Sequence, residues 1–134
     1  MAREDVEVVC SVIAAFESAG VEGALRYFDP DVAWFGPPEW PEDRLYEGYD
    51  GLREVASVWT ENFDDFQLDL QTAVDAGDHV LALIIQRAVI KGSGHELERR
   101  VSWVCELRNG RVASVHPYFS WEEGLEAVGL AQFR

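Results

Sequence analysis

Residues 66–119 read FQLDLQTAVDAGDHVLALIIQRAVIKGSGHELERRVSWVCELRNGRVASVHPYF, and this stretch decides the fold. Apolar and polar residues alternate from Phe66 to Val74, which predicts a half-buried strand. The run from Val80 to Ile90 is apolar at both alternating positions, which is typical of a strand covered on both sides. Turn sequences separate the segments, and Asn109-Gly110 is the strongest short hairpin signal among them. The stretch therefore predicts four antiparallel strands joined by turns, at 66–74, 80–90, 95–107 and 111–119.

The residues before this stretch favour helices. Val6, Val9, Ile13 and Phe16 recur at three- and four-residue steps, and Gly20 is placed to end the helix that they predict. A short second helix is expected at 22–28, a strand at 31–35 and a third helix at 50–63. After the sheet, residues 120–123 form a capping box that predicts a final helix.

Helices that precede a run of hairpin-linked strands indicate an α+β fold in one domain, residues 1–134. We expect one cone-shaped, curved antiparallel sheet with the N-terminal helices packed on its inner face, enclosing a pocket. In this order the helices are expected to cover one face only. The strand at 80–90 then needs a second cover, and another copy of the same sheet is the simplest one. The sequence therefore predicts a homodimer through the outer sheet face.

The charge of the chain excludes several partners. Its formal net charge is −14, and it contains one lysine, Lys91, and no basic run. Phosphate groups are bound by clustered Lys and Arg, so we expect neither a nucleic acid nor a membrane as partner. No apolar run approaches the roughly 20 residues of a membrane span, and residues 1–5 do not resemble a signal peptide. These features predict a cytoplasmic protein.

Neither the cysteines nor the histidines show the spacing of a metal site. Cys10 and Cys105 lie in apolar stretches, which predicts buried free thiols. His79 and His95 lie beside turns and His116 lies in a strand, without ligand spacing. We expect no metal and no cofactor.

Five segments, in order, resemble one known family. They are FESAGVEGAL with FDPDV (16–25 and 28–32), YEGYDGL (46–52), DAGDHV (75–80), LRNGRV (107–112) and EGLEA (123–127). Together they are similar to the SnoaL-like branch of the nuclear transport factor two-like superfamily, which also holds ketosteroid isomerases and limonene epoxide hydrolases. The resemblance implies a cone-shaped barrel with a deep apolar pocket between helices and sheet, usually in dimers.

The catalytic residues of the ketosteroid isomerases are missing from the matching positions. In that family a catalytic Asp follows the first strand just before a Pro, where this chain has Gly36. The oxyanion-hole Tyr falls at about Val12, and the oxyanion-hole Asp falls near Ser102. Steroid-type isomerisation by that machinery is therefore not expected.

The limonene epoxide hydrolase pattern is incomplete as well. Arg87 occupies the Arg position, but Val89 and Pro117 stand where the two Asp residues should be. The acidic base of the SnoaL cyclases also falls at or beside Pro117. An arginine without its two carboxylates cannot position and deprotonate a water in that way.

Four polar residues remain as candidates: Arg87, His116, Tyr118 and Glu47. Arg87 interrupts an apolar strand, so it must find a partner. The alternatives are an ion pair with a helix carboxylate such as Glu54 or Glu61, exit at the dimer interface, or contact with a ligand. His116 is a candidate base because histidine titrates near neutral pH, and a solvent or interface position is the alternative.

Trp34 and Trp40 lie on either side of the first two prolines of a predicted loop. The large aromatic residues, taken together, suggest a cavity lined by aromatic side chains more strongly than any one of them does. The leading hypothesis is that the chain binds a small apolar, ring-containing metabolite. The alternative is an isomerase, hydrolase or cyclase with His116 as base and Arg87 or Tyr118 as electrophilic partner. A third hypothesis is an association module that uses the sheet face. The expected ligand-binding residues are Trp34, Trp40, Tyr46, Trp59, Phe63 and Trp103.

Overall fold

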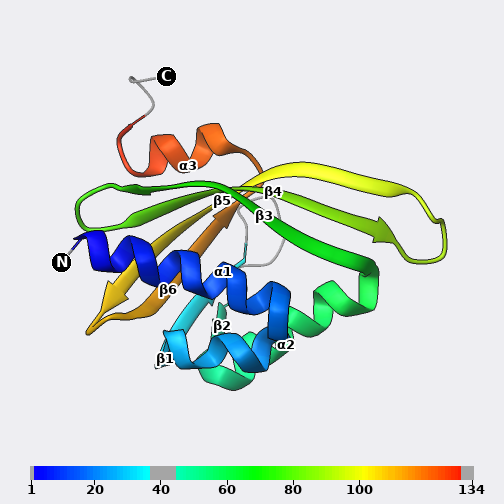
Figure 1. Cartoon of the computed structure of the whole chain (residues 1–134), viewed down its shortest axis with the longest axis horizontal. Coiled ribbons are helices and arrows are strands. Elements are labelled where there is room, and N and C mark those ends of the chain that lie inside the picture. Colours follow the sequence, from blue (N-terminus) through cyan, green and yellow to red (C-terminus); the bar gives the residue numbers. More distant parts are fainter. Residues whose placement is uncertain (1, 37–44, 131–134) are drawn as a thin grey trace.

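The structure, a computed structural model, describes residues 2–36 and 45–130. The helical elements are α1 (Ala2–Ala24), the short 3-10 helix η1 (Leu25–Tyr27), α2 (Gly48–Asn62) and α3 (Trp121–Ala127). The strands are β1 (Phe28–Phe35), β2 (Leu45–Glu47), β3 (Phe63–Asp75), β4 (Val80–Ile90), β5 (Glu96–Arg108) and β6 (Arg111–Tyr118). They form one sheet in the order β2-β1-β6-β5-β4-β3 (Figure 1). The α+β prediction is confirmed.

The four long strands β3 to β6 pair antiparallel with their neighbours, as the turn sequences predict. Asn109 and Gly110 both have positive φ, 54° and 76°, which is the geometry of a tight two-residue hairpin turn. The prediction of an entirely antiparallel sheet is wrong at one point, because β1 pairs parallel with β6. The sheet is therefore mixed.

The predicted loop after the first strand contains a strand. Residues 45–47 form β2, in which Tyr46 pairs with Trp34 of β1 and is buried. Pairing to β1 overrides the loop-like composition here, since it buries the Tyr46 ring and satisfies the backbone polar groups of β2.

The N-terminal helices differ from the prediction in their boundaries. Gly20 has a φ of 68° and a ψ of −165°, which are not helical values, so the first helix ends there as predicted. The bounds of α1 span this kink and include the short helical segment that continues to Ala24. The second helix expected at 22–28 corresponds to the segment of α1 after the kink followed by η1, and it is shorter than expected because Phe28 already begins β1.

Two apolar clusters lie on the two faces of the sheet. The larger cluster joins α1 and α2 to the inner face, with Val9, Ile13 and Leu52 buried in it. The smaller cluster packs Trp121 and Leu125 of α3 and its C-terminal turn on the outer face, and Figure 1 shows α3 on the side of the sheet opposite to α1 and α2. The expectation that helices cover only one face is wrong, because the chain turns back after β6.

Close backbone approach fixes α3 on the sheet. A Cβ atom added to Gly124 would lie 2.3 Å from Ser102 Oγ on β5, and that hydroxyl donates a hydrogen bond to the carbonyl oxygen of Ser120. The Ser120 hydroxyl accepts from the Glu123 backbone N–H and donates to the Glu123 carboxylate, so Ser120 caps the final helix as the sequence predicts.

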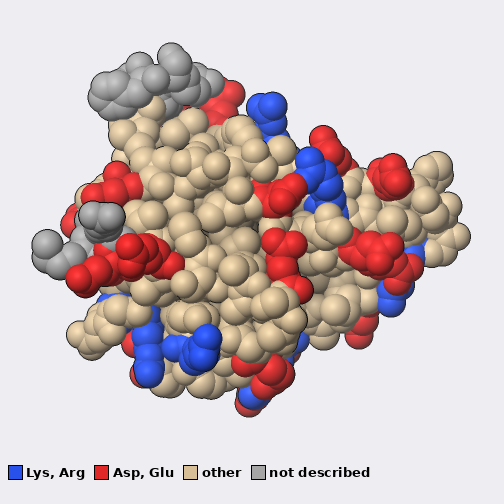
Figure 2. Space-filling view, viewed as in Figure 1, with Lys and Arg blue, Asp and Glu red and all other residues tan. Residues whose placement is uncertain are grey.

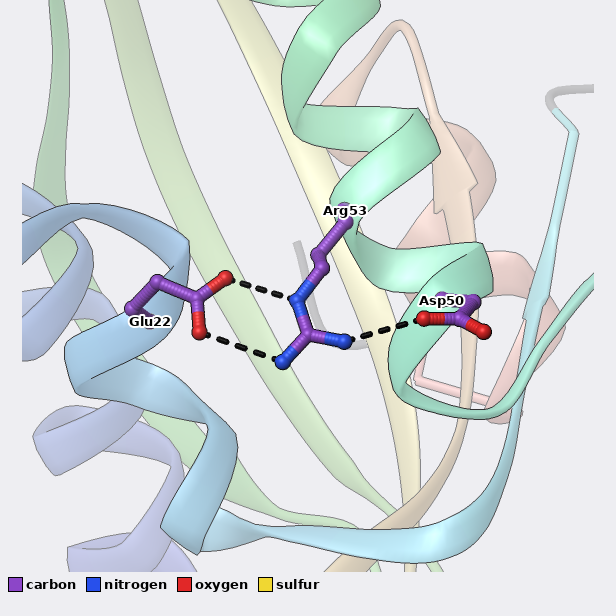
Figure 3. Close-up of polar contacts among 3 residues, drawn as sticks. All are labelled: Glu22, Asp50 and Arg53. Carbon is purple, nitrogen blue, oxygen red and sulfur yellow. Dashed lines mark hydrogen bonds and ion pairs between the residues drawn. The ribbon is translucent and has the colours of Figure 1, made fainter.

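A charged contact ties the end of α1 to the beginning of α2 (Figure 3). The Arg53 guanidinium bonds both carboxylate oxygens of Glu22 at 2.7 and 3.2 Å, and Asp50 at 2.9 Å. The hydrogen bond to Arg53 is the main reason that the pKa of Glu22 lies below its ordinary value. All three side chains are exposed, so the contact orients the two helices more than it stabilises them.

Acidic groups are scattered over the one face of the molecule that Figure 2 shows. On the face shown in Figure 2, carboxylates occur over the whole view, with lysine and arginine groups among them and no broad basic patch. The stretch Glu4–Tyr27 is long and apolar enough to cross a membrane by length and composition alone, which differs from the expectation that no apolar run approaches that length. One such helix near the N-terminus is weak evidence for a membrane span. In the fold, Val9, Val12 and Ile13 of this stretch are buried in the inner core.

Candidate functional site

A cavity of about 520 Å³ lies between α2 and the inner face of the sheet. Its wall is built mainly from aromatic and aliphatic side chains of α2 and of strands β1 to β6. Five polar or charged residues interrupt that wall. The lining residues are Trp34, Gly36, Tyr46, Val55, Val58, Trp59, Glu61, Asn62, Phe63, Leu68, Gln86, Ile90, Lys91, Arg99, Val101, Trp103, Pro117, Tyr118 and Phe119.

Three tryptophans from separate elements meet at this cavity. The Trp34 ring lies edge-on to Trp103 at 5.0 Å and to Trp59 at 5.7 Å between centroids. Trp59 lies parallel to Phe66 at 4.9 Å, with an interplanar angle of 12°. These distances and tilts are the favoured arrangements of aromatic rings, so the rings hold one another in fixed orientations.

Five of the six residues that the sequence suggests as ligand-binding line this cavity: Trp34, Tyr46, Trp59, Phe63 and Trp103. The sixth, Trp40, lies outside the described residues. The strand pairing of β1 with β2 and the position of α2 over the sheet bring the five together, although they are up to 69 positions apart in the sequence.

Arg87 does not line the cavity. On β4 the even-numbered residues face the inner core and the odd-numbered ones face outward, and Arg87 is odd-numbered. Its guanidinium bonds Asp69, and bonds Glu98 at 3.0 Å, and both of these acids lie on neighbouring strands. The ion pair expected with Glu54 or Glu61 of a helix is replaced by pairs within the sheet.

His116 is also outside the cavity lining. It pairs in register with Val104, which belongs to the outer cluster, and its ring stacks on Phe35 at 4.0 Å. Burial is the main cause that lowers the pKa of His116, with nearby His79 acting in the same direction and Glu106 opposing it. The neutral imidazole is therefore favoured on this outer face.

The suggested catalytic set is divided between the two faces of the sheet. Tyr118 borders the cavity, but it pairs with Ser102 and packs against the outer cluster below α3. A mechanism that uses Arg87 and His116 on one substrate requires both side chains in one cavity. That arrangement is absent, so this cavity does not support that mechanism.

Arg99 on β5 is a cavity residue that the sequence analysis did not single out. Its Nε–H donates to Oε1 of Gln86, and its guanidinium lies 4.3 Å above the centre of the Phe119 ring. Burial lowers the pKa of Arg99. A signal was present in the sequence: Arg99 is in the same alternation phase as Leu97, Val101 and Trp103.

Among the described residues that line the cavity, Glu61 is the only carboxylate and there is no histidine. Glu61 is exposed near the end of α2. Glu47 lies on β2, exposed, and is not part of the lining. Within the described chain no three His, Cys, Asp or Glu side chains are grouped to hold a metal ion.

Comparison with solved structures gives relatives of the same fold. A protein of unknown function described as NTF2-like, from Burkholderia pseudomallei, is 18% identical with a TM-score of 0.76, over 94% of this chain and 98% of that one. A putative polyketide cyclase from Xanthomonas campestris pathovar campestris is 19% identical with a TM-score of 0.74, over 95% and 98%. TerC, co-crystallised with polyporic acid, is 18% identical with a TM-score of 0.76, over 93% and 98%. At these identities the likeness shows the fold alone.

A search of curated protein sequences gave no match to the chain. The model of the SnoaL-like domain family matches residues 9–115, which is well over half of the sequence. The resemblance seen in the five sequence segments is thereby confirmed. This chain belongs to the SnoaL-like domain family.

Proposed function

We propose that the chain binds a flat, ring-containing small molecule in the cavity between α2 and the sheet. The observation that carries this proposal is a cavity of about 520 Å³ with tryptophan rings from three elements in its wall. Small-molecule sites commonly measure about 300–1,000 Å³ and are lined mainly by apolar and aromatic side chains with a few polar groups.

The rigidity of the wall supports a ring-shaped ligand. Trp34 and Trp103 are almost fully buried and hold each other edge-to-face, so the cavity keeps its shape without a ligand. Neither indole N–H donates a hydrogen bond to another described residue. A planar ligand would gain apolar burial and ring contacts here without first ordering the wall.

The solved relatives support the same reading at the level of the fold. One is described as a putative polyketide cyclase, and TerC was crystallised with polyporic acid. The co-crystal of one relative with a small organic molecule supports the same use of the fold here. Whether the cavity also converts its ligand is a separate matter. No general base in a buried environment lies in the described part of the lining.

Titration of tryptophan fluorescence with naphthalene, anthracene and flavone derivatives tests the proposal. We expect saturable quenching by the ring compounds and none by aliphatic compounds of similar volume. The Trp59→Phe variant should lose much of the signal, because Trp59 lines the cavity. The matched control, Trp121→Phe, removes an indole on the outer face and should leave the response unchanged. Absence of any ring-dependent response would contradict the proposal.

We also propose that two copies associate through the outer sheet face, and that the chain is cytoplasmic. The part of that face beside α3 is covered by Trp121 and Leu125, so the dimer would use the remainder, around His116 and Phe35. Analytical ultracentrifugation at micromolar concentration should give the mass of a dimer. A monomer mass would refute the association, without affecting the proposal for the cavity.

A further inference from the structure

The polar centre of the cavity is the pair Gln86 and Arg99, which lies in one row across the sheet with Leu68. Leu68 of β3 pairs with Gln86 of β4, and Gln86 pairs with Arg99 of β5. All three residues line the cavity. The row places one cationic and one amide side chain between apolar neighbours, with Ile84 and Val101 on one side and Leu97 on the other.

The Arg99 guanidinium is held at two points that leave one edge free. Its Nε–H is occupied by Oε1 of Gln86, a side chain whose residue is only 4% exposed. One face of the guanidinium lies over the Phe119 ring. The Nη1 and Nη2 groups donate no hydrogen bond to another described residue. Arginine presents its donors in a rigid plane, so this free edge has the geometry for a bidentate acceptor.

Arg99 lines the cavity and lacks a carboxylate partner; Arg100 and Arg111 also lack one within the described chain, but neither of them lines the cavity. Arg53, Arg87, Lys91 and Arg108 each have a carboxylate within 4.0 Å. Arg99 has no carboxylate partner among the described residues, although the chain has 25 acidic residues and only 11 basic ones. Burial lowers its pKa, but arginine stays protonated in proteins. The charge is therefore partly desolvated without compensation by an anion of the protein.

We propose that the ligand of this cavity is an aromatic or polycyclic acid, whose carboxylate or ionised hydroxyl accepts hydrogen bonds from the Nη groups of Arg99. This inference rests on the proposed function. The proposed function specifies the shape of the ligand, and the inference specifies that the ligand carries a negative charge. The Gln86 side chain positions Arg99, and the amide nitrogen of Gln86 is a second donor toward the same group. Its amide donates to no acceptor in the described chain.

The charged residues at the rim of the cavity, Lys91 and Glu61, do not provide the anion-binding role that we assign to Arg99. Lys91 lines the cavity at the end of β4, but its ammonium group is exposed and lies 3.9 Å from Asp64. Glu61, also at the rim, is exposed and would repel an anion that stayed in the entrance. An acid is therefore favoured only when its anionic group reaches the interior, with its rings against the tryptophans.

Isothermal titration with two matched probes at pH 7 tests the inference. The probes are 2-naphthoate and 2-naphthamide, which share the ring system and differ in charge. We expect the protein to bind the naphthoate about 10- to 100-fold more tightly than the amide, since hydrogen bonds to a charged group are the stronger kind. In Arg99→Gln the naphthoate should lose this advantage, while the affinity for the amide should change little.

A matched control lies at the next position of the same strand. Arg100 faces outward over the Trp121 ring, and Arg100→Gln removes the same charge without touching the cavity. It should keep the preference for naphthoate, and Arg99→Lys should keep part of it. Circular dichroism and the unfolding midpoint show whether each variant is folded, and Arg99→Lys carries the test should Arg99→Gln not fold.

The outcomes separate this inference from the proposed function. Equal binding of the two probes, or a preference for naphthoate that is the same in all variants, would overturn the anion site and leave the ring site standing. If neither probe nor any member of the ring panel binds, both proposals are wrong. A preference for naphthoate that disappears in Arg99→Gln and persists in Arg100→Gln is the result that supports the inference.

Discussion

A substitution at Val101 distinguishes a hollow interior from a filled one. Val101 is 5% exposed and, by exposure alone, is a core residue. Enlarging a residue in a packed core costs about 1–3 kcal/mol, because neighbouring side chains must leave their rotamers. Val101, however, lines a cavity of about 520 Å³. In Val101→Phe the added ring has space, so we expect no loss of stability and a gain of up to about 2 kcal/mol from filling a cavity.

Val115 provides the matched control. It is 1% exposed, belongs to the inner core on β6 and does not line the cavity. Both positions are valines in strands, so the change of intrinsic strand propensity is the same in the two variants. Val115→Phe should therefore show the full cost of overpacking, about 1–3 kcal/mol.

Urea unfolding, followed by far-ultraviolet circular dichroism, measures the difference. With a slope of about 2 kcal/mol per molar urea, a loss of 2 kcal/mol lowers the midpoint by about 1 M. The midpoint of Val101→Phe should equal or exceed that of the parent chain, and ring compounds should no longer quench its fluorescence. If Val101→Phe is as unstable as Val115→Phe, the interior at Val101 is filled and the reasoning is refuted.

Three further predictions concern parts of the fold away from the cavity. Gly124→Ala should lower the unfolding midpoint even though alanine favours helices by about 1 kcal/mol, because the new Cβ would lie 2.3 Å from Ser102 Oγ; an unchanged or raised midpoint would contradict the close packing of α3. Because the pKa of His116 is lowered on folding, the unfolded chain binds its proton first, and stability should fall as the pH is lowered through the ordinary histidine range. His116→Phe should flatten this slope between pH 7 and 5 relative to His95→Asn at an exposed turn, and equal slopes would refute the assignment. Burial raises the pKa of Cys105 to about 12, so a disulfide reagent at pH 8 should modify Cys10 in the native protein and Cys105 only after unfolding; equally fast reaction of both thiols would contradict the burial of Cys105.

The sheet was predictable because its signals are local. Strand alternation, the Asn109-Gly110 turn and the Ser120 helix cap each act over a few residues, and the structure contains all of them. The parallel pairing of β1 with β6 and the short strand β2 depend on residues far apart in the sequence. No local pattern specifies such pairings, and they were missed.

The candidate site was predictable in its aromatic part and not in its polar part. Three of the tryptophans, Trp34, Trp59 and Trp103, line the cavity, whereas Trp121 packs on the outer face. An arginine can contact a ligand in the cavity only if its side chain points to the inner face of the sheet. Because β4 is apolar on both faces, the sequence pattern does not tell which face Arg87 occupies. On β5 the alternation of Leu97, Val101 and Trp103 does give a phase, and it assigns Arg99 to the cavity.

The packing of α3 leaves less of the outer sheet face for a second copy of the chain to cover than the sequence suggests. The outer positions Leu81 and Leu83 of β4 are covered by Trp121 and Leu125 of the same chain. Further along β4, the outer face carries the ion pairs of Arg87 rather than apolar side chains. The sequence pattern showed that a second cover was needed, and the chain itself supplies part of it.

A crystal structure of the protein with 2-naphthoate tests the central claim most directly. The account predicts the naphthalene ring between α2 and the sheet, against Trp59 and Trp103, with the carboxylate in hydrogen-bond distance of the Arg99 Nη atoms. Side chains that occupy this volume, or a naphthoate bound elsewhere with the cavity inaccessible to it, would contradict the account.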